Sequence, residues 1–172
     1  MTQRLILASA SPRRSELLSR AGLAFEVIAA DVDESPLDGE TPEAYVVRVA
    51  HAKADQVARA HPEALVLAAD TTVVLEGRIL GKPASVDEAL ATLEALGGRT
   101  HRVLSAVALS GRARAAHVET THVTMRRAPR AELAWYVATG EPMDKAGAYA
   151  IQGIGAQLVS RIEGSHSNVI GL

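Results

Sequence analysis

Short apolar runs alternate with helix-like patterns in the first half of the chain. Residues 5–8, 25–30 and 65–69 each have the length and apolar content of a strand, and polar or turn residues bound them. The stretches 12–21 and 42–60 carry apolar side chains at helical spacing, and each begins with a proline that follows a hydroxyl residue. This alternation of strands and helices favours an α/β domain.

Strands cluster in the second half of the chain, where turn residues separate them. Ser85 and Glu88 have the spacing of a capping box before one further helix, which Gly97 ends. The pattern there predicts strands at residues 72–75, 78–80, 103–109, 118–125 and 157–162, and helices at residues 86–96 and 129–138. Because strands and helices alternate early and strands cluster late, we expect one α/β domain over residues 1–172, with a mixed sheet, two lobes and a central cleft.

The composition is that of an ordinary globular chain without a global positive field. Of 172 residues, 48% are hydrophobic and 22% charged, and the formal net charge is −2. A negative chain with few aromatic side chains does not suit a nucleic-acid module, so an anion site has to be local. The chain has no cysteine, which excludes disulfides, thiolate catalysis and cysteine zinc sites. No stretch reaches the roughly 18 apolar residues of a membrane span, and we expect a soluble, cytoplasmic protein with no membrane or nucleic-acid partner.

Lysine is rare in this chain, which uses arginine at nearly every basic position. Lys53, Lys82 and Lys145 are the three lysines among 18 basic residues. An ammonium group is a compact, strongly hydrated point charge, so we interpret these three as phosphate contacts; chance placement is the alternative. Lys53 shares the apolar stripe of its predicted helix, which predicts a buried stem. A snorkelling structural lysine remains the other interpretation of that position.

A basic turn joins the first predicted strand to the first predicted helix. Arg13 and Arg14 lie in the first helical turn, where the helix macrodipole disfavours cations. Their placement makes physical sense if an anion binds the backbone N–H groups and guanidinium groups there. A solvated basic turn with Glu16 as local partner is the alternative.

Carboxylates follow two of the predicted strands. Asp31, Asp33 and Glu34 come after the second strand, and Glu34 is our candidate ligand for a hard divalent ion, which requires carboxylate oxygen. Asp70 follows the buried run 65–69, where a charge needs a partner because its desolvation is costly. It is therefore either catalytic or part of a structural ion pair, with Lys82 as the expected neighbour.

Residues 144–153 form a further candidate segment. Its glycines permit close approach of backbone to a ligand, and the amide of Gln152 offers both a donor and an acceptor to a base edge. Glycine and small residues dominate residues 146–155, which overlap it and which we call the glycine segment. A tight turn with a polar tip is the alternative interpretation.

Four segments taken together resemble the Maf family of nucleoside triphosphate pyrophosphatases. They are residues 9–14, 69–71, 81–83 and 144–153, which occur in the family's order, and the resemblance runs from residue 5 to residue 172. It implies a Maf/inosine-triphosphatase-like α/β fold. It also implies hydrolysis of a nucleoside triphosphate to the monophosphate and pyrophosphate with a divalent cation, Mg²⁺ or Mn²⁺. Ala150 stands where glycine is usual, and the sequence stops where the family continues with a final helix, which we expect to be absent.

The resemblance also implies roles for single residues. Asp70 matches the catalytic proton acceptor, and Arg13, Thr71 and Gln152 match positions that set base preference in the dTTP/UTP branch, which differs there from the branch acting on 7-methyl-GTP. Modified pyrimidine triphosphates are further candidate substrates. In the resulting hypothesis Glu34 and Asp70 hold the metal, and the other substrate contacts are Ser9, Arg14, Lys53, Lys82 and Lys145. The hypothesis requires all these residues to meet at one pocket.

A binding role is the main rival to catalysis. The family resemblance also allows a nucleotide sensor, or a cell-division (septum) protein that acts without essential turnover. A sensor needs phosphate ligands but no buried carboxylate beside them, so hydrolysis is the favoured interpretation. Homodimer formation is left open.

Overall fold

The computed structural model describes residues 4–172, and the chain divides into two compact units. Unit 1 comprises residues 4–71, 105–119 and 171–172, and unit 2 comprises residues 72–104 and 120–170. The strands are hydrogen-bonded in the order β2-β1-β3-β5-β6-β7, with β4 paired to β3. Parallel and antiparallel pairs both occur, so the expected mixed-sheet α/β class is confirmed.

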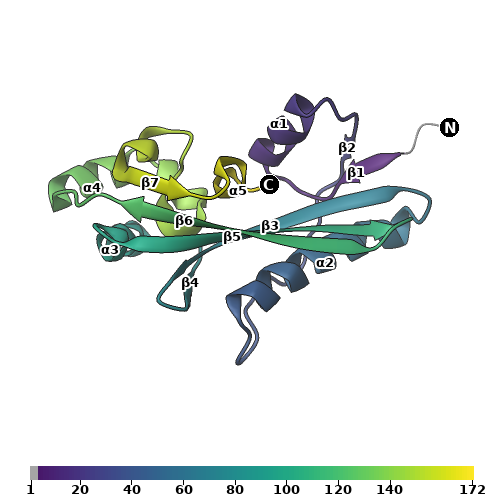
Figure 1. Ribbon diagram of the computed structural model, residues 1–172, viewed down its shortest axis with the longest axis horizontal. Helices are drawn as coiled ribbons and strands as arrows, with labels where there is room; N and C mark the ends of the chain where they lie inside the picture. Colours follow the sequence, from purple (N-terminus) through teal and green to yellow (C-terminus); the bar gives the residue numbers. More distant parts are fainter. Residues whose placement is uncertain (1–3) are drawn as a thin grey trace. The chain divides into compact units, whose positions relative to one another are not determined.

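Unit 1 is built on parallel strands joined by two crossover helices. β1 (Leu5–Leu7) lies between β2 (Glu26–Val27) and β3 (Leu65–Leu75), and it is parallel to both. The connection through α1 (Pro12–Arg20) runs from β1 to one side, and the connection through α2 (Pro42–Ala60) runs back past β1 to the other. Because such crossovers are right-handed, the two helices lie on opposite faces of the strands, as Figure 1 shows.

β3 is longer than the sequence predicts, and Asp70 lies within it. The two strands predicted at residues 65–69 and 72–75 are one continuous strand, β3. Asp70 therefore lies in the middle of a strand rather than at its end. A polar interruption of an apolar run predicts a strand end, but here the aspartate charge has a buried partner, so the strand continues. Of the residues of β3, Leu65–Leu67 pair with β1, and the later part of β3 extends beyond the carboxyl end of β1.

Two further local predictions need correction. β2 is limited to Glu26–Val27 instead of residues 25–30, because this strand lies at the end of the strand order and both its side chains are exposed. Ser11 precedes α1 as expected, but its hydroxyl makes no capping hydrogen bond; its own N–H donates to Ser9 Oγ instead. In contrast, Thr41 caps α2 as predicted, since its Oγ1 accepts a hydrogen bond from Ala44 N at 3.2 Å.

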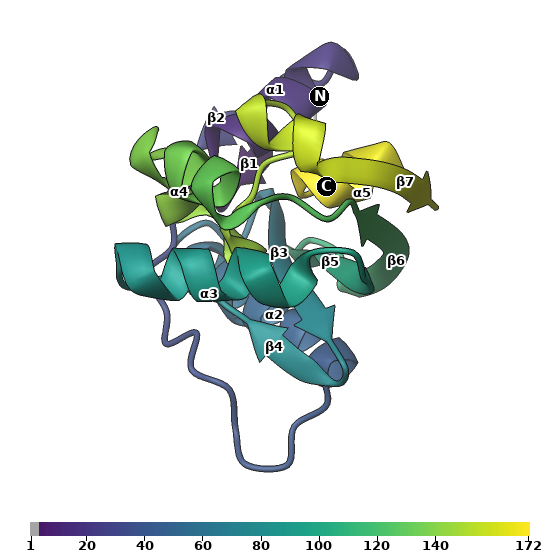
Figure 2. The same ribbon diagram turned by 90° about the vertical axis from the view of Figure 1, so that its left-hand side faces the viewer.

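A hydrophobic core fills unit 2, in which two buried tyrosines accompany mainly aliphatic side chains. α3 (Val86–Leu96) and α4 (Arg130–Ala138) lie side by side (Figure 2). Ser85 Oγ caps α3 by accepting from Glu88 N at 3.1 Å, as its capping box predicts. The inward face of α3 is also confirmed, with buried Ala89, Leu90, Leu93 and Leu96. The remaining elements are β4 (Arg78–Leu80), β5 (Thr100–Gly111), β6 (Ala115–Met125), η1 (Glu141–Asp144), η2 (Ala146–Ala148), η3 (Ile154–Leu158), β7 (Val159–Glu163) and α5 (His166–Ile170).

Among residues 4–172, the structure contains no helix with the length and apolar character that crossing a membrane demands.

A buried histidine in unit 2 makes stability depend on pH. His101 Nε2 lies 2.7 Å from the Tyr149 hydroxyl, and its Nδ1 is buried without a hydrogen bond from any described residue. Burial lowers the pKa of His101 to about 4 from the ordinary 6.5. Between pH 6.5 and pH 4 the unfolded chain therefore binds a proton at His101 that the folded chain does not. The contribution of neutral His101 to the free energy of unfolding is fully present above pH 6.5 and falls as the pH is lowered.

We expect His101 to contribute up to about 1.4 kcal/mol per pH unit to the loss of unfolding free energy across that window. Urea denaturation at intervals from pH 7 to pH 4 measures the slope, which should be shallower in His101→Gln. The same substitution at the exposed His122 serves as the control. Equal slopes in His101→Gln and wild type would contradict the assignment.

Candidate active site

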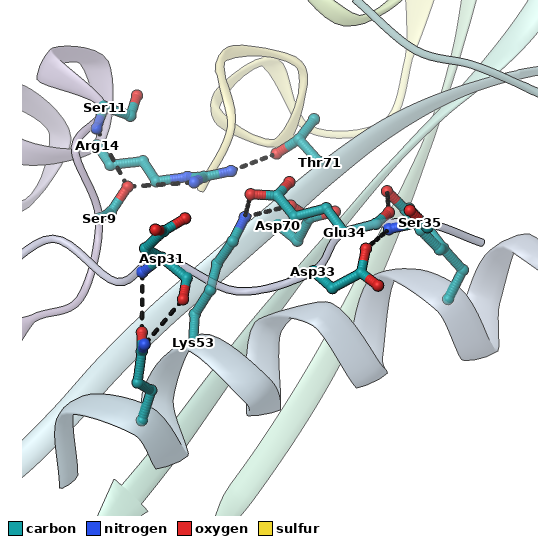
Figure 3. Close-up of polar contacts among 12 residues, drawn as sticks. Ser9, Ser11, Arg14, Asp31, Asp33, Glu34, Ser35, Lys53, Asp70 and Thr71 are labelled. Atoms are coloured by element: carbon teal, nitrogen blue, oxygen red, sulfur yellow. Dashed lines mark hydrogen bonds and ion pairs between the residues drawn. The ribbon is translucent and has the colours of Figure 1, made fainter. Parts of the chain in front are cut away.

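A lysine and two carboxylates meet in unit 1. Lys53 Nζ lies 2.8 Å from Asp70 Oδ1 and 3.0 Å from Glu34 Oε1 (Figure 3). Lys53 and Asp70 are only 8% and 5% exposed, whereas the Glu34 side chain is half exposed. The ammonium group thus offsets the free-energy cost of burying the Asp70 carboxylate. The half-exposed Glu34 supplies a second carboxylate oxygen that accepts from the same ammonium.

The position of Lys53 follows from the apolar stripe of α2. Val46, Val49, Ala50 and Val57 are buried on this helix, and Lys53 lies at the matching helical spacing. Its stem is therefore buried as predicted, and its ammonium reaches β3 at Asp70. The structural ion pair expected for Asp70 exists, but its partner is Lys53 in place of Lys82.

Glu34 is positioned by side chains of α2 that the sequence analysis did not single out. Gln56 exchanges two hydrogen bonds of 2.8 Å with the backbone of Asp31, and Tyr45 donates from its hydroxyl to Glu34 O at 2.9 Å. Arg48 donates to Ser35 O at 2.9 Å. These contacts hold the acidic loop along α2, so Glu34 faces Lys53 even though no strand carries it. Burial, with the charges of Asp70 and Glu34, raises the pKa of Tyr45 to about 12, so its hydroxyl remains a donor.

Arg14 connects the basic turn to β3, β5 and the residues near 172. Its Nε donates to Gly171 O at 2.9 Å, and its terminal nitrogens donate to Ser9 Oγ at 3.2 Å and Thr71 Oγ1 at 3.1 Å (Figure 3). Thr71 Oγ1 is in turn 2.8 Å from Ser105 Oγ. Ser105 is a further residue that sequence reasoning missed, because no local pattern marks a strand serine as a partner of a threonine 34 positions earlier.

The charge on Arg14 is held in a largely buried setting. Burial lowers the pKa of its guanidinium, as does nearby Arg13, whereas Asp70 and Glu34 act in the opposite direction. A guanidinium remains protonated in proteins, and of its five N–H donors three donate to residues within 4–172. One N–H on each terminal nitrogen has no hydrogen bond to a described residue. The structure therefore brings together Ser9, Arg13, Arg14, Glu34, Lys53, Asp70 and Thr71 in unit 1.

The other predicted substrate residues belong to unit 2. Lys82 and Gln152 are exposed, and Lys145 is paired with Asp144 and donates to Glu141 O at 3.3 Å. Gly147 N donates to Gly81 O at 3.1 Å, so the end of the β3–β4 hairpin touches the glycine segment. Gly147 has φ +71°, and a side chain there would meet Val73 at 2.9 Å, which explains the glycine. Convergence of these unit 2 residues with Asp70 stays a prediction.

The donor set in unit 1 suits a hard divalent cation. Glu34 Oε1 and Asp70 Oδ1 both lie within 3.0 Å of Lys53 Nζ, so the two carboxylates are close together, and a metal ion would bind lone pairs that the Lys53 ammonium leaves open. Mg²⁺ and similar ions prefer such oxygens, and Mg²⁺ is commonly held by one or two carboxylates together with substrate phosphates. Glu34 and Asp70 therefore fit the ligand role that the sequence predicted for them.

Comparison with known proteins supplies the family. The family described as Maf-like protein matches residues 4–172, nearly the whole chain. The chain belongs to the Maf family. A dTTP/UTP pyrophosphatase of Myxococcus xanthus (strain DK1622) is 56% identical over 168 residues, which are 98% of this chain and 86% of that protein. One from Nitratidesulfovibrio vulgaris (strain Hildenborough) is 56% identical over 171 residues, covering 98% of this chain and 81% of that protein.

Among solved structures, the Ham1 protein of Staphylococcus aureus matches with a TM-score of 0.49 and 21% identity, over 73% of this chain and 72% of that one. The family assignment does not depend on this match. It rests on the sequence comparisons, which confirm the resemblance drawn from four short segments.

Proposed function

We propose that this chain hydrolyses dTTP and UTP to the nucleoside monophosphate and pyrophosphate. The observation that carries the proposal is the buried Asp70, paired with Lys53 beside Glu34, because a buried carboxylate in such a charge cluster is a candidate catalytic group that can orient a water molecule. The names of the relatives, which are 56% identical over nearly the full chain, support the substrate pair.

In the proposed reaction, water attacks the α-phosphorus and pyrophosphate leaves. Lys53 contacts Oδ1 of Asp70, so we assign Oδ2 to orient the water and accept its proton. Arg14 and Ser9 bind phosphate at the start of α1, where backbone N–H groups also point outward. Catalysis then consists mainly of positioning and charge stabilisation, as is general for phosphoryl chemistry.

The metal ion is proposed as Mg²⁺ or Mn²⁺, which Glu34 and Asp70 would hold. When bound, it neutralises charge that develops on the phosphate groups. Lys82 and Lys145 are proposed as further phosphate contacts. Arg13, Thr71 and Gln152 are proposed to select the pyrimidine. The cytoplasmic location and the homodimer stay predictions.

Pyrophosphate release from a panel of triphosphates tests the function. We expect release from dTTP and UTP in the presence of Mg²⁺ or Mn²⁺, little from ATP or GTP, and loss of release when a chelator is added. Modified pyrimidine triphosphates in the same panel set the breadth of the substrate range. Release of inorganic phosphate alone, or no release from any pyrimidine triphosphate, would reject the proposal.

Lys82→Arg tests whether a point charge is needed at this position. A planar guanidinium differs in shape and hydration from a compact ammonium and does not make the same phosphate contact. We therefore expect kcat/KM for dTTP to fall by about tenfold or more. A tenfold fall corresponds to a loss of about 1.4 kcal/mol of transition-state stabilisation. Arg78→Lys, the opposite exchange at an exposed position of β4, is the control and should leave the rate unchanged. A Lys82→Arg rate equal to wild type would remove this lysine from the phosphate contacts.

A further inference from the structure

The backbone of the glycine segment is hydrogen-bonded to one carboxylate in unit 2, that of Glu141. Glu141 Oε1 accepts hydrogen bonds from Gly155 N at 2.9 Å and from the Tyr136 hydroxyl at 2.8 Å. Its other oxygen, Oε2, accepts from Ile154 N at 2.9 Å. Burial alone would raise the pKa of Glu141, but these three hydrogen bonds and nearby Lys145 outweigh it and lower the pKa. Glu141 is therefore a charged acceptor, and hydrogen bonds to a charged acceptor are the stronger kind.

Tyr136 binds the backbone on the other side of Gln152, at Ala150. Its hydroxyl donates to Glu141 and accepts a hydrogen bond from Ala150 N at 3.2 Å. Its ring is fully buried in the core of unit 2, so the hydroxyl has a fixed position. The backbone is thus held at residue 150 and again at residues 154 and 155, and the exposed Gln152 lies between these anchor points.

The close fit of the segment requires glycine at two places. A Cβ atom at Gly153 would lie 2.2 Å from Glu141 Oε2, and one at Gly155 would lie 2.4 Å from the Tyr136 hydroxyl. Both contacts are far shorter than van der Waals distance, so the backbone rests directly on the two polar side chains. Gly153 and Gly155 thus allow the backbone to approach Glu141 and Tyr136 closely, and the ligand approach that the sequence predicted for the glycines of residues 144–153 stays a prediction.

We propose that Glu141 and Tyr136 are positioning residues that determine base selectivity by fixing Gln152. This inference rests on the proposed function, in which Gln152 hydrogen-bonds the pyrimidine edge. The side-chain amide can donate and accept, and thymine or uracil differs from cytosine in whether the base presents a carbonyl or an amino group. Discrimination between them requires an amide held in one place, because a mobile amide can satisfy either base.

Tyr136→Phe tests the proposal with little change in shape, since only the bridging hydroxyl is lost. We expect the ratio of kcat/KM for dTTP to that for CTP to fall about tenfold, equivalent to about 1.4 kcal/mol. Amide hydrogen exchange should show faster exchange at residues 150, 154 and 155. Thr121→Val is the matched control, because it removes a buried hydroxyl of unit 2 that bonds to Ser165 and Asn168, outside the glycine segment; its ratio should match wild type. Glu141→Gln is the second variant, and it should lower the ratio in the same direction.

The decisive measurement combines Tyr136→Phe with Gln152→Ala. If the tyrosine acts through Gln152, the double variant has the same dTTP-to-CTP ratio as Gln152→Ala alone. An additive loss, or an unchanged ratio in a folded Tyr136→Phe protein that shows faster exchange, would overturn the positioning role and leave the proposed hydrolysis intact. Absence of hydrolysis by the wild-type protein would overturn both.

Discussion

Asp70→Asn is expected to lower turnover of dTTP by on the order of 10²-fold or more, the usual effect of losing a general base. The amide cannot accept the proton of the attacking water, although it has nearly the shape of the carboxylate. Nucleotide binding should persist, because the proposed phosphate contacts Ser9 and Arg14 are unchanged. Steady-state pyrophosphate release measures the rate, and calorimetric titration with a non-hydrolysable dTTP analogue measures binding.

The same variant separates catalysis from a purely binding role. A nucleotide sensor without essential turnover would bind dTTP and release no pyrophosphate in wild type or variant alike. Asp38→Asn, which changes an exposed carboxylate of the acidic loop, is the control and should keep the wild-type rate. A rate near that of wild type in Asp70→Asn would show that another group activates the water.

Lys53→Met should have the largest effect on stability. It leaves the buried Asp70 carboxylate without the ammonium that lies 2.8 Å away, and removing one partner of a buried ion pair costs about 3 kcal/mol. Turnover should be lost as well, because the proposed phosphate contact of Lys53 disappears. Urea denaturation measures the free energy of unfolding, with the m-value checked for two-state behaviour.

A double-mutant cycle isolates the ion pair from loss of packing. In an Asp70→Asn background the Lys53→Met substitution should cost less than about 1 kcal/mol, since no buried charge is then left unpaired. Lys82→Met changes an exposed lysine and should leave the unfolding free energy within about 0.5 kcal/mol of wild type. Equal costs of Lys53→Met in both backgrounds would show that Lys53 stabilises the fold through its stem alone.

Several parts of unit 1 could be predicted because local chemistry decides them. The apolar stripe of α2 placed Lys53 on a buried face, and the start of α2 followed from Thr41 and its proline. In β3 the same local reasoning failed. A charged residue inside an apolar run predicts a strand end, and only the ammonium supplied by α2 permits Asp70 within the strand.

The supporting residues of both units could not be predicted for the same physical reason. Ser105 has no neighbour in sequence that marks it, yet its hydroxyl lies 2.8 Å from that of Thr71. Glu141 follows a glycine and precedes a proline, which predicts a turn, yet its carboxylate accepts from backbone N–H groups 13 and 14 positions later. Hydrogen bonds of this range depend on which elements the fold places together, and residue type alone does not encode that.

By itself the sequence determined the types of the longer helices and strands, the family and the residues that carry charge, because periodicity, capping and short motifs act over a few neighbouring positions. Tertiary structure decided the partners: Asp70 pairs with Lys53, Arg14 reaches Ser9, Thr71 and Gly171, and Glu141 secures the glycine segment. The reason is that burial makes an unpaired charge or N–H group costly, and the partner that removes this cost comes from whichever element packs alongside.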